Sequence, residues 1–572
     1  MALDALTARV HPTARVRPGG RRADALAVAS YLLAAVVLCG RLLAHPGQRL
    51  PYTPGDRIQA EYHLAYAARI LHHLGNPLLI DRLNAPVGVN AMANTTQFGL
   101  GIPMAPVTWL LGPGVAFDVL IVAALAGTAA AWYWLLSRHV VDSRPAAWVG
   151  GLVGGFAPSV VNHATFHPNL TAQFLVPVIA WRVVRLFDSR RFVRDGLILA
   201  ALIVWQVFVN EETLFIAALA IGVFLLLWRG PRWRPILPGL AVAAGASLLV
   251  LAYPLWWQFF GTGAYRGGEQ QMTAFHTDLL GVTSFSRNSV VVRLSEFPPA
   301  PGFSAEQHAY FGWPLMLAAA AFVAWRWRDR LVRSLALTGA LFLVLSLGTE
   351  LTVRGRATGI PGPYALLARL PLFDTLLPTR LGEVATWALA PIAALAVAAA
   401  RLPSRVLTAG LVAAVLLPAA PTPTLVFDRP AVPAFITTGA WRPYVAADDS
   451  VLVVPLADFE HWTALQWSTA TGLDLRLSHG YFLGPEGGVT GRHAVVGPPR
   501  RFLDGLLRTP PAAVTAADRD RAAADLGYWH TALILAPPEA AVAPQRALLD
   551  ALFGPGRLTG GVWMWDVRGV RR

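Results

Sequence analysis

The stretch ADALAVASYLLAAVVLCGRLLA, residues 23–44, decides the fold class of this chain. An α-helix needs about 20 mainly apolar residues to cross a bilayer, and this run is long enough. Its end lacks the small-residue pattern at which a signal peptide is cleaved, and further apolar runs follow it. We therefore interpret residues 23–44 as a retained first membrane helix, preceded by an arginine-rich arm over residues 1–22.

The composition agrees with a protein whose main solvent is lipid. Of the 572 residues, 55% are hydrophobic and only 14% are charged, whereas a soluble domain carries about 25% charged residues. The formal net charge is +14, and every basic residue is arginine. An all-arginine chain rich in Ala, Pro and Gly is typical of a high-GC genome, so the arginine content by itself does not indicate nucleic-acid binding. We expect a lipid bilayer as partner and no nucleic acid. The single cysteine, Cys39, excludes an intrachain disulfide.

Apolar runs recur as far as residue 420 and predict a mainly α, polytopic membrane helix bundle of about 11 spans. Arginine-rich segments lie at every second boundary between the runs, which is the positive-inside pattern and places the N-terminus in the cytoplasm. An odd number of spans then places the C-terminus outside the plasma membrane. The predicted spans are residues 23–44, 115–137, 145–161, 169–187, 195–210, 212–228, 236–258, 310–325, 333–348, 381–400 and 404–420.

The composition changes near residue 421, where the predicted membrane domain of residues 23–420 ends. Short apolar stretches at 450–455, 531–535 and 561–567 predict buried strands. Helical patterns lie near 460–470, 500–507, 515–526 and 541–553. This alternation favours a small extracytoplasmic α/β domain over residues 421–572, and no complete catalytic motif falls within it.

Acidic, amide and imidazole side chains collect in the segments predicted to lie outside, beginning with the outer loop of residues 45–114. Acids near a bilayer are costly unless they are paired or functional. Whatever this protein does, we expect it to do on the outer side. The side chains in question are Asp56, Glu61, Asp81, Asn84, Asn90, Asn94, Asn162, His163, His167, Asn169, Glu211, Glu212, Asp278, Glu306, Asp374 and Arg380.

Asp56 is the strongest candidate for chemistry. It lies in the stretch YTPGDRIQ, residues 52–59, just beyond the first span and ahead of a helix predicted over residues 57–74 at the membrane interface. A carboxylate there can deprotonate or orient an acceptor hydroxyl. The alternative is that Asp56 caps the helix that begins at Arg57, since Asp is a favoured N-cap residue. The two roles can coexist.

Two further groups at predicted span ends suit the same chemistry. Glu211 and Glu212 follow Asn210 at a tight turn between two spans, and they are either further catalytic acids or a solvated turn. Arg380, just ahead of the tenth span, can hold a phosphate. Its alternative role is an interfacial anchor whose charged head reaches water.

The remaining candidates are predicted to contact substrate. His163 and His167 have the spacing of a metal pair, although Pro168 weakens the helical geometry that such a pair needs. Asp278 either contacts substrate or begins a helix. Asn90 and Arg57, both in the first outer loop, complete the predicted substrate-binding set. The sequence defines no metal ligands, and a divalent metal stays an open question.

Several of these stretches together resemble actinobacterial multi-span proteins of the GT-C glycosyltransferase superfamily, over about residues 24–400. The resemblance implies a helix bundle with an outer soluble domain, a polyprenyl-phosphate sugar as donor, and an essential acid in the first outer loop, where Asp56 lies. Many relatives carry paired acids in that loop, whereas Arg57 follows Asp56 here. This difference leaves open whether a metal is used, and whether Glu212 or Asp278 supplies a second acid. The matching stretches are residues 54–59, 75–77, 84–90, 105–108, 210–212, 253–261, 277–281 and 377–380.

The resemblance and the outer polar residues together predict an inverting glycosyltransferase that moves a sugar from a polyprenyl-phosphate donor to a cell-envelope glycan acceptor. Asp56 is then the base, Arg380 holds phosphate, and Glu212 assists. One alternative is a carrier or flippase for lipid-linked glycan intermediates, and another is a non-catalytic envelope-assembly protein. A carrier needs polar residues deep within its spans and on both faces, so the one-sided distribution favours the enzyme. The sugar, the acceptor and the oligomeric state are not specified.

Overall fold

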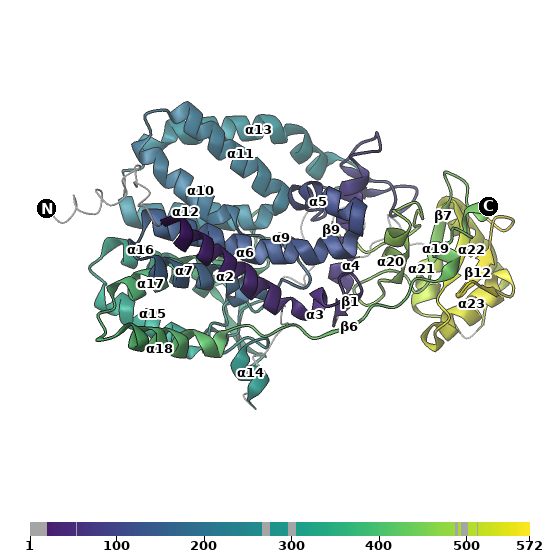
Figure 1. The fold of residues 1–572 in the computed structure, drawn as a ribbon. Helices are drawn as coiled ribbons and strands as arrows, with labels where there is room; N and C mark the ends of the chain where they lie inside the picture. Colours follow the sequence, from purple (N-terminus) through teal and green to yellow (C-terminus); the bar gives the residue numbers. More distant parts are fainter. Residues whose placement is uncertain are drawn as a thin grey trace. The chain divides into compact units, whose positions relative to one another are not determined.

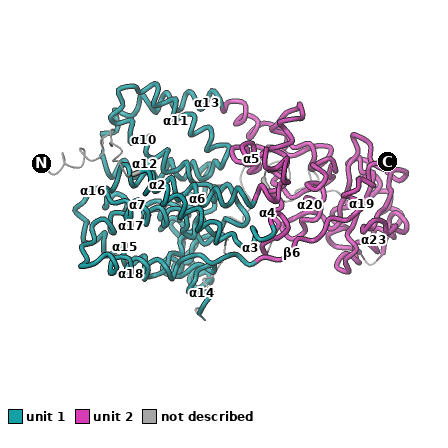
Figure 2. Tube along the Cα trace, viewed as in Figure 1, with its two compact units in different colours: residues 1–45, 118–250, 270–425 teal, residues 46–117, 251–269, 426–572 magenta. Residues whose placement is uncertain are grey.

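The computed structural model describes residues 20–52, 54–230, 232–265, 275–295, 305–486, 490–493, 502–511 and 513–571, and the chain is mainly helical (Figure 1). Residues 1–19 of the predicted arginine-rich arm therefore lie outside the described residues. The chain forms two compact units (Figure 2). Unit 1 comprises residues 1–45, 118–250 and 270–425, and unit 2 comprises residues 46–117, 251–269 and 426–572.

Helices occupy every one of the predicted spans. Five helical segments are long and apolar enough to cross a membrane, judged by length and composition: Pro113–His139, Phe192–Val209, Glu211–Arg229, Arg234–Phe260 and Pro378–Ala399. The other predicted spans coincide with helices that are shorter, interrupted or, like α2, charged at one end, so the number of spans stays a prediction. The helices that coincide with the predicted spans are α2 (Gly20–Leu38), α3 (Gly40–Leu43), α6 (Pro113–His139), α7 (Arg144–Phe156), α8 (Pro158–Val161), α9 (Pro168–Thr171), α10 (Leu175–Arg185), α11 (Phe192–Val209), α12 (Glu211–Arg229), α13 (Leu237–Phe260), α15 (Trp313–Trp325), α16 (Arg330–Leu345), α17 (Glu383–Ala399) and α18 (Arg405–Leu416).

Helix α7 lies unusually close to its neighbours because its facing positions are glycines. A Cβ on Gly151 would lie 2.2 Å from the Tyr31 hydroxyl of α2 and 2.9 Å from the Ala129 carbonyl oxygen of α6. A Cβ on Gly155 would lie 2.4 Å from the Cβ of Ala129. The Tyr31 hydroxyl also donates a hydrogen bond of 2.8 Å to the Trp148 carbonyl of α7. Small residues at helix contacts are typical of membrane bundles. The hydrophobic effect does not drive helices together inside a bilayer, so their association depends on close packing of the helix backbones.

Replacement of Gly151 by leucine is expected to destabilise unit 1. The added side chain has no space between α2 and α6, so the helices must separate, at a cost of about 1–3 kcal/mol or more. Thermal unfolding of the full chain in detergent measures the effect. Gly222→Leu on α12 is the matched control, because no atom lies within 4 Å of a Cβ at Gly222. Equal melting temperatures for the two variants would contradict this packing argument.

Unit 2 joins the first loop to the C-terminal part of the chain. Strand β1 (Arg49–Pro51) pairs antiparallel with β6 (Val426–Asp428). The Arg82 Nε donates to the Leu473 carbonyl at 2.8 Å, and the Leu477 amide donates to the Arg82 carbonyl at 3.0 Å. The Asn94 amide both donates to and accepts from the backbone of Leu483. The predicted loop 45–114 and the predicted domain 421–572 thus contribute to the same compact unit.

The strands and helices predicted after residue 421 are present. Their sheet has the order β11-β12-β10-β7, in which β10 runs parallel to β7 and antiparallel to β12. Both β7 and β10 are buried along their whole length. The elements of this region are β7 (Ser450–Val453), α20 (Thr463–Ala470), β8 (Leu483–Glu486), β9 (Thr490–His493), α21 (Phe502–Arg508), α22 (Ala516–Tyr528), β10 (Thr531–Ala536), α23 (Ala543–Phe553), β11 (Arg557–Thr559) and β12 (Val562–Asp566). That this region lies outside the cell stays a prediction.

The first loop contains two helices, α4 (Gly55–Arg69) and α5 (Phe98–Leu111). Helix α4 begins two residues before the predicted start, with Pro54 at the N-cap, so the interpretation of Asp56 as the helix cap is wrong. Asp56 lies instead in the first turn of the helix. The helix is also buried around most of its circumference rather than along one face. Burial extends to charged residues because Glu61 is paired with arginine within the unit.

Candidate functional site

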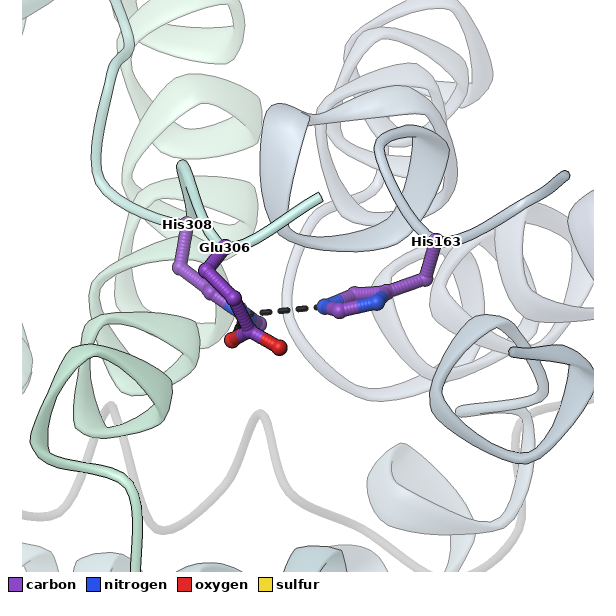
Figure 3. Close-up of side chains that lie close together, drawn as sticks. All are labelled: His163, Glu306 and His308. Atoms are coloured by element: carbon purple, nitrogen blue, oxygen red, sulfur yellow. Dashed lines mark hydrogen bonds and ion pairs between the residues drawn. The ribbon is translucent and has the colours of Figure 1, made fainter. Parts of the chain in front are cut away.

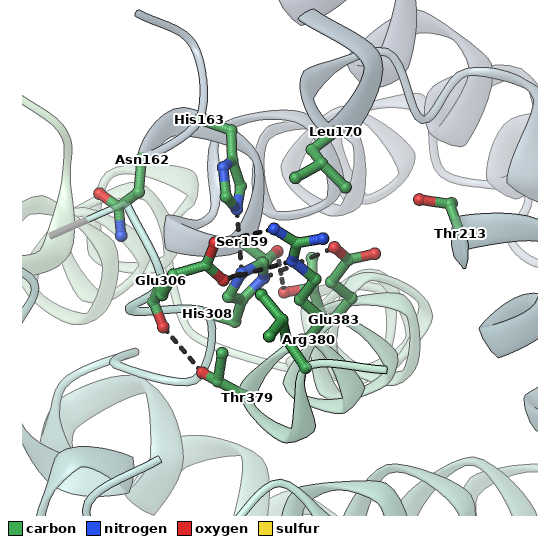
Figure 4. A network of polar contacts seen from close by, with 12 residues as sticks. Ser159, Asn162, His163, Leu170, Thr213, Glu306, His308, Thr379, Arg380 and Glu383 are labelled. Carbon is green, nitrogen blue, oxygen red and sulfur yellow. Dashed lines mark hydrogen bonds and ion pairs between the residues drawn. The ribbon is translucent and has the colours of Figure 1, made fainter. Parts of the chain in front are cut away.

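A buried polar cluster in unit 1 brings together side chains from five separate segments. We call it the Arg380 cluster. His163 follows α8, Glu212 lies in the first turn of α12, Glu306 and His308 precede α15, Arg380 lies in the 3₁₀ turn Pro378–Gly382, and Glu383 lies in the first turn of α17. Figure 4 shows most of these side chains pointing toward one another. Carboxylates in the first turn of a helix are stabilised by its dipole, which suits Glu212 and Glu383. The members of the cluster are His163, Glu212, Glu306, His308, Arg380 and Glu383.

Arg380 is held between two carboxylates. Its Nη2 lies 3.0 Å from Glu306 Oε1, its Nε lies 3.4 Å from Glu306 Oε2, and its Nη1 donates to Glu212 Oε2. The Thr379 hydroxyl donates to the backbone carbonyl of Glu306 at 2.7 Å, which fixes the loop that carries this acid. The amide of Leu377 lies 3.4 Å from Glu212 Oε1. The cluster is therefore a geometrically defined ion-pair network, in which the guanidinium bridges two separate elements.

Glu306 is ionised in this environment. Burial by itself would raise the pKa of Glu306, but the charge of Arg380 and the hydrogen bond from His308 hold this pKa well below its usual range. Burial, together with the neighbouring His308, lowers the pKa of His163 well below its ordinary value, so that His163 is a neutral imidazole. A neutral imidazole offers a lone pair, which is the form that binds metals.

Three histidines form a chain of ring contacts. His163 Nε2 lies 2.9 Å from His308 Nε2, and Figure 3 shows this pair. His163 Nδ1 lies 3.0 Å from His167 Nδ1. His308 Nε2 lies 3.1 Å from Glu306 Oε2, and His308 Nδ1 lies 3.5 Å from Glu383 Oε1. One ligand atom each from His163, Glu306 and His308 fall within 4.8 Å of one another. Among the described residues, these three are the group of acids and imidazoles that could hold a metal ion.

Asp56 lies in unit 2, where a residue of the C-terminal region binds it. The Tyr481 hydroxyl donates a hydrogen bond of 2.9 Å to Asp56 Oδ1. The Gln59 side chain, one turn along α4, donates to the Tyr481 carbonyl at 2.8 Å. Burial and the charge of Asp56 both raise the pKa of Tyr481, so the phenol stays a hydrogen-bond donor. The predicted cavity shared by Asp56 with Glu212 and Arg380 stays a prediction, since these residues belong to different units.

Arg57, predicted to contact substrate, is fully buried in unit 2. Its Nε donates to Glu61 Oε1 at 2.9 Å, and its guanidinium lies 4.6 Å above the Phe117 ring. Arg429 Nη2 donates to the same Glu61 oxygen at 2.6 Å. Burial would raise the pKa of Glu61, but the two guanidinium groups lower it below its ordinary value. These contacts give Arg57 and Glu61 a part in holding unit 2 together.

The other predicted substrate residues have backbone partners. Asn90 Nδ2 donates to the Trp257 carbonyl at 2.9 Å within unit 2. Asp278 accepts from the Leu280 amide at 2.9 Å and from the Gly355 amide at 2.8 Å within unit 1. The short 3₁₀ helix that follows, Gly281–Thr283, has Leu280 as its N-cap, so the alternative that Asp278 begins a helix is wrong. Glu211 is the first residue of α12, after the N-cap residue Asn210. Contacts of Asn90 and Asp278 with substrate, and a catalytic role of Glu211, stay predictions.

Sequence reasoning did not select three members of the cluster. Glu306 and His308 stand two residues apart just ahead of an apolar run, and this spacing is the signal that would have found them. Glu383 lies inside a predicted span, where an ionisable side chain indicates function by default. His163, Glu212 and Arg380 were selected, and the contacts through His308 and Glu306 bring these three into one network.

Comparison with known proteins identifies the class of fold. The solved structure of arabinofuranosyltransferase AftD from Mycobacteria matches with a TM-score of 0.57 and 17% sequence identity, over 96% of this chain and 40% of AftD. The archaeal oligosaccharyltransferase AglB from Archaeoglobus fulgidus matches with a TM-score of 0.44 and 10% identity, over 96% of this chain and 74% of AglB. The likeness to AftD confirms the GT-C-like fold implied by the sequence resemblance. The five helical segments that are long and apolar enough to cross a membrane support a membrane-embedded protein.

The family follows from the sequence itself. The chain belongs to a family described as a domain of unknown function, DUF6311, which matches residues 60–422. No curated protein matches the sequence. The match to AftD shows the fold, and because the chain spans 40% of the length of AftD, the activity must be argued from the residues of this chain.

Proposed function

We propose that this protein is a membrane glycosyltransferase that moves a sugar from a polyprenyl-phosphate donor to a cell-envelope glycan acceptor on the outer face of the membrane. The observation that carries the proposal is the likeness of the fold to AftD, by its name an arabinofuranosyltransferase, over 96% of this chain. The position of Asp56 in the first turn of α4 supports it, since an acid in the first outer loop is what a GT-C-type reaction requires.

In the proposed reaction, Asp56 is the general base. The acceptor hydroxyl oxygen attacks the anomeric carbon, the bond from this carbon to the phosphate oxygen breaks, and polyprenyl phosphate leaves with the electron pair. The hydroxyl proton passes to the Asp56 carboxylate, which the Tyr481 hydroxyl holds in place through Oδ1. Attack opposite to the leaving group inverts the configuration at the anomeric carbon.

Arg380 is the proposed phosphate-binding residue. Its guanidinium is already paired, so it can bind phosphate only by exchanging a carboxylate partner. Glu212 is the better candidate for exchange, because its side chain is 22% exposed, whereas that of Glu306 is 10% exposed. Guanidinium groups bind carboxylate and phosphate with the same forked geometry, so the exchange conserves the arrangement of donors.

A transfer assay tests the proposal. The full chain, reconstituted in liposomes, is given polyprenyl-phosphate arabinofuranose with a labelled sugar, chosen because of the name of AftD, together with an envelope glycan acceptor. Label in the glycan and release of polyprenyl phosphate are expected. Movement of intact donor across the bilayer without cleavage would instead support a carrier. Neither cleavage nor movement with any of a panel of polyprenyl-phosphate sugars would favour a non-catalytic assembly protein.

Tyr481→Phe is expected to reduce transfer by about tenfold, since the hydrogen bond that orients Asp56 and stabilises its charge is lost. The acidic limb of the pH–rate profile should move to higher pH, because the carboxylate is less stabilised without its donor. Asp458 is the other acid whose charge acts on Tyr481, and Asp458→Asn is the control for a general electrostatic effect. An unchanged pH profile for Tyr481→Phe would contradict this role.

A further inference from the structure

We propose that His163, Glu306 and His308 bind one divalent transition-metal ion of the zinc type. His308 provides the first argument. Its Nε2 faces His163 Nε2 and Glu306 Oε2, while its Nδ1 faces Glu383 Oε1. A neutral imidazole has a single N–H, which cannot serve both edges of the ring. Among the described residues, His308 Nδ1 has no hydrogen-bond partner.

A metal ion resolves the hydrogen bonding. The Nε2 lone pairs of His163 and His308 and the Oε2 atom of Glu306 then all point at the cation. The proton of His308 moves to Nδ1, where Glu383 accepts it, and the proton of His163 sits on Nδ1, which faces His167 Nδ1. An acceptor behind each ligating imidazole is the usual arrangement at protein metal sites, where it fixes the tautomer and the ring orientation.

The spacing of the ligand atoms fits a small cation. Zinc bonds of about 2.0–2.1 Å in tetrahedral geometry place neighbouring ligand atoms about 3.3 Å apart. The contacts of 2.9 Å between the two Nε2 atoms and 3.1 Å between His308 Nε2 and Glu306 Oε2 need to widen by only a few tenths of an ångström. Glu306 Oε1 keeps its contact with Arg380, so the ligand carboxylate stays anchored from behind.

The unsatisfied atoms beside the three ligands also point to a bound ion. The side chain of Glu383 is fully buried, and within the described part of the chain neither of its oxygens has a hydrogen-bond partner. Buried polar groups without partners are costly. With the cation on His308 Nε2, the proton of this imidazole lies on Nδ1 and faces Glu383 Oε1, 3.5 Å away, so that both atoms gain a partner.

The donor atoms select the class of metal. Two imidazoles and one carboxylate suit zinc and its transition-metal neighbours, whereas magnesium and calcium prefer all-oxygen sites. Three protein ligands are also the number typical of sites that keep a position open for water or substrate. The assignment does not rest on the proposed function, because it is argued from the geometry of His163, Glu306 and His308, and none of these three has a role in the proposed reaction.

Direct metal binding tests the proposal. The full chain, purified in detergent with a tag that lacks histidine, is stripped with a chelator and dialysed against Zn²⁺. Elemental analysis is expected to give one zinc per chain, and zinc should raise the thermal unfolding midpoint by about 3 °C when saturating. Co²⁺ in place of Zn²⁺ should give visible absorption bands of a site with nitrogen ligands. Less than about 0.2 zinc per chain would overturn the assignment.

Variants locate the site. Glu306→Gln and His163→Asn should weaken zinc binding at least 100-fold, and Glu383→Gln, which acts through His308, should weaken it about 10–100-fold. His63→Asn is the matched control, since His63 is a buried histidine of unit 2, and it should bind zinc as the wild type does. Each variant is used only if it elutes as a monodisperse species. Unchanged stoichiometry and affinity in folded Glu306→Gln and His163→Asn would place the zinc elsewhere and overturn the proposal.

Discussion

Asp56→Asn is expected to lower the rate of sugar transfer by about 10²–10⁴-fold, the contribution typical of a positioned general base. The amide has the shape of the carboxylate and can still accept the hydrogen bond from Tyr481, so α4 should keep its place. The amide cannot take the proton of the acceptor hydroxyl. The transfer assay with labelled polyprenyl-phosphate sugar measures the rate, and donor affinity measured separately should change little.

Asp81→Asn is the matched control for Asp56. Asp81 is an exposed acid of the same loop, and the same substitution there should leave transfer unchanged. Thermal unfolding midpoints of the two variants should agree with that of the wild type. Wild-type transfer by Asp56→Asn would remove Asp56 from the reaction and leave the fold as the sole support for the enzyme.

The helices and strands were predictable because each depends on local sequence. The apolar runs gave helices in all predicted spans, and the stretches at 450–455, 531–535 and 561–567 gave strands β7, β10 and β12. The division into units was not predictable in this way. It rests on contacts such as that between Arg82 and Leu473, whose positions are 391 residues apart. Nothing in the local pattern of either segment specifies such a partner.

The same limit applies to the candidate site. Sequence reasoning selected Asp56, Glu212, Arg380 and His163 from their positions at span ends. It could not pair them, because pairing depends on which helix ends meet. The contact of Asp56 with Tyr481 joins the first turn of α4 to a residue 425 positions later. The interpretation of Asp56 as a helix cap failed for a local reason, since α4 begins at Gly55 and its N-cap is Pro54.

Glu61→Gln is expected to lower the free energy of unfolding by about 3–5 kcal/mol, because it removes the anion from a buried ion-pair network. Arg57 is fully buried and Arg429 Nη2 lies 2.6 Å from Glu61 Oε1, so the neutral amide removes the negative charge that both guanidinium groups contact. Unfolding of the full chain in detergent measures the loss. Glu460→Gln, an exposed acid of the same unit, is the control and should change nothing.

A second variant separates charge from packing at this position. If the loss in Glu61→Gln comes from uncompensated charge, then adding Arg429→Gln should recover part of the stability, since one cation is removed with its partner. Additive losses in the double variant would mean that the side chains act by filling space. The network would then be a packing feature, and the argument for buried electrostatics in α4 would fail.

The pH dependence of the stability difference between wild type and Glu61→Gln gives an independent check, and the direction of its change with pH follows from the pKa of Glu61. The pKa of Glu61 is lower in the folded protein than its ordinary value of 4.5. A depressed carboxyl pKa contributes stability that is present above the unfolded value and is lost as the pH falls through the folded value. The stability gap between wild type and Glu61→Gln should therefore be constant above pH 4.5 and narrow below it. Other carboxyl groups titrate in both proteins and cancel, so a gap that stayed constant under acid would show that the charge of Glu61 is not what holds α4 in place.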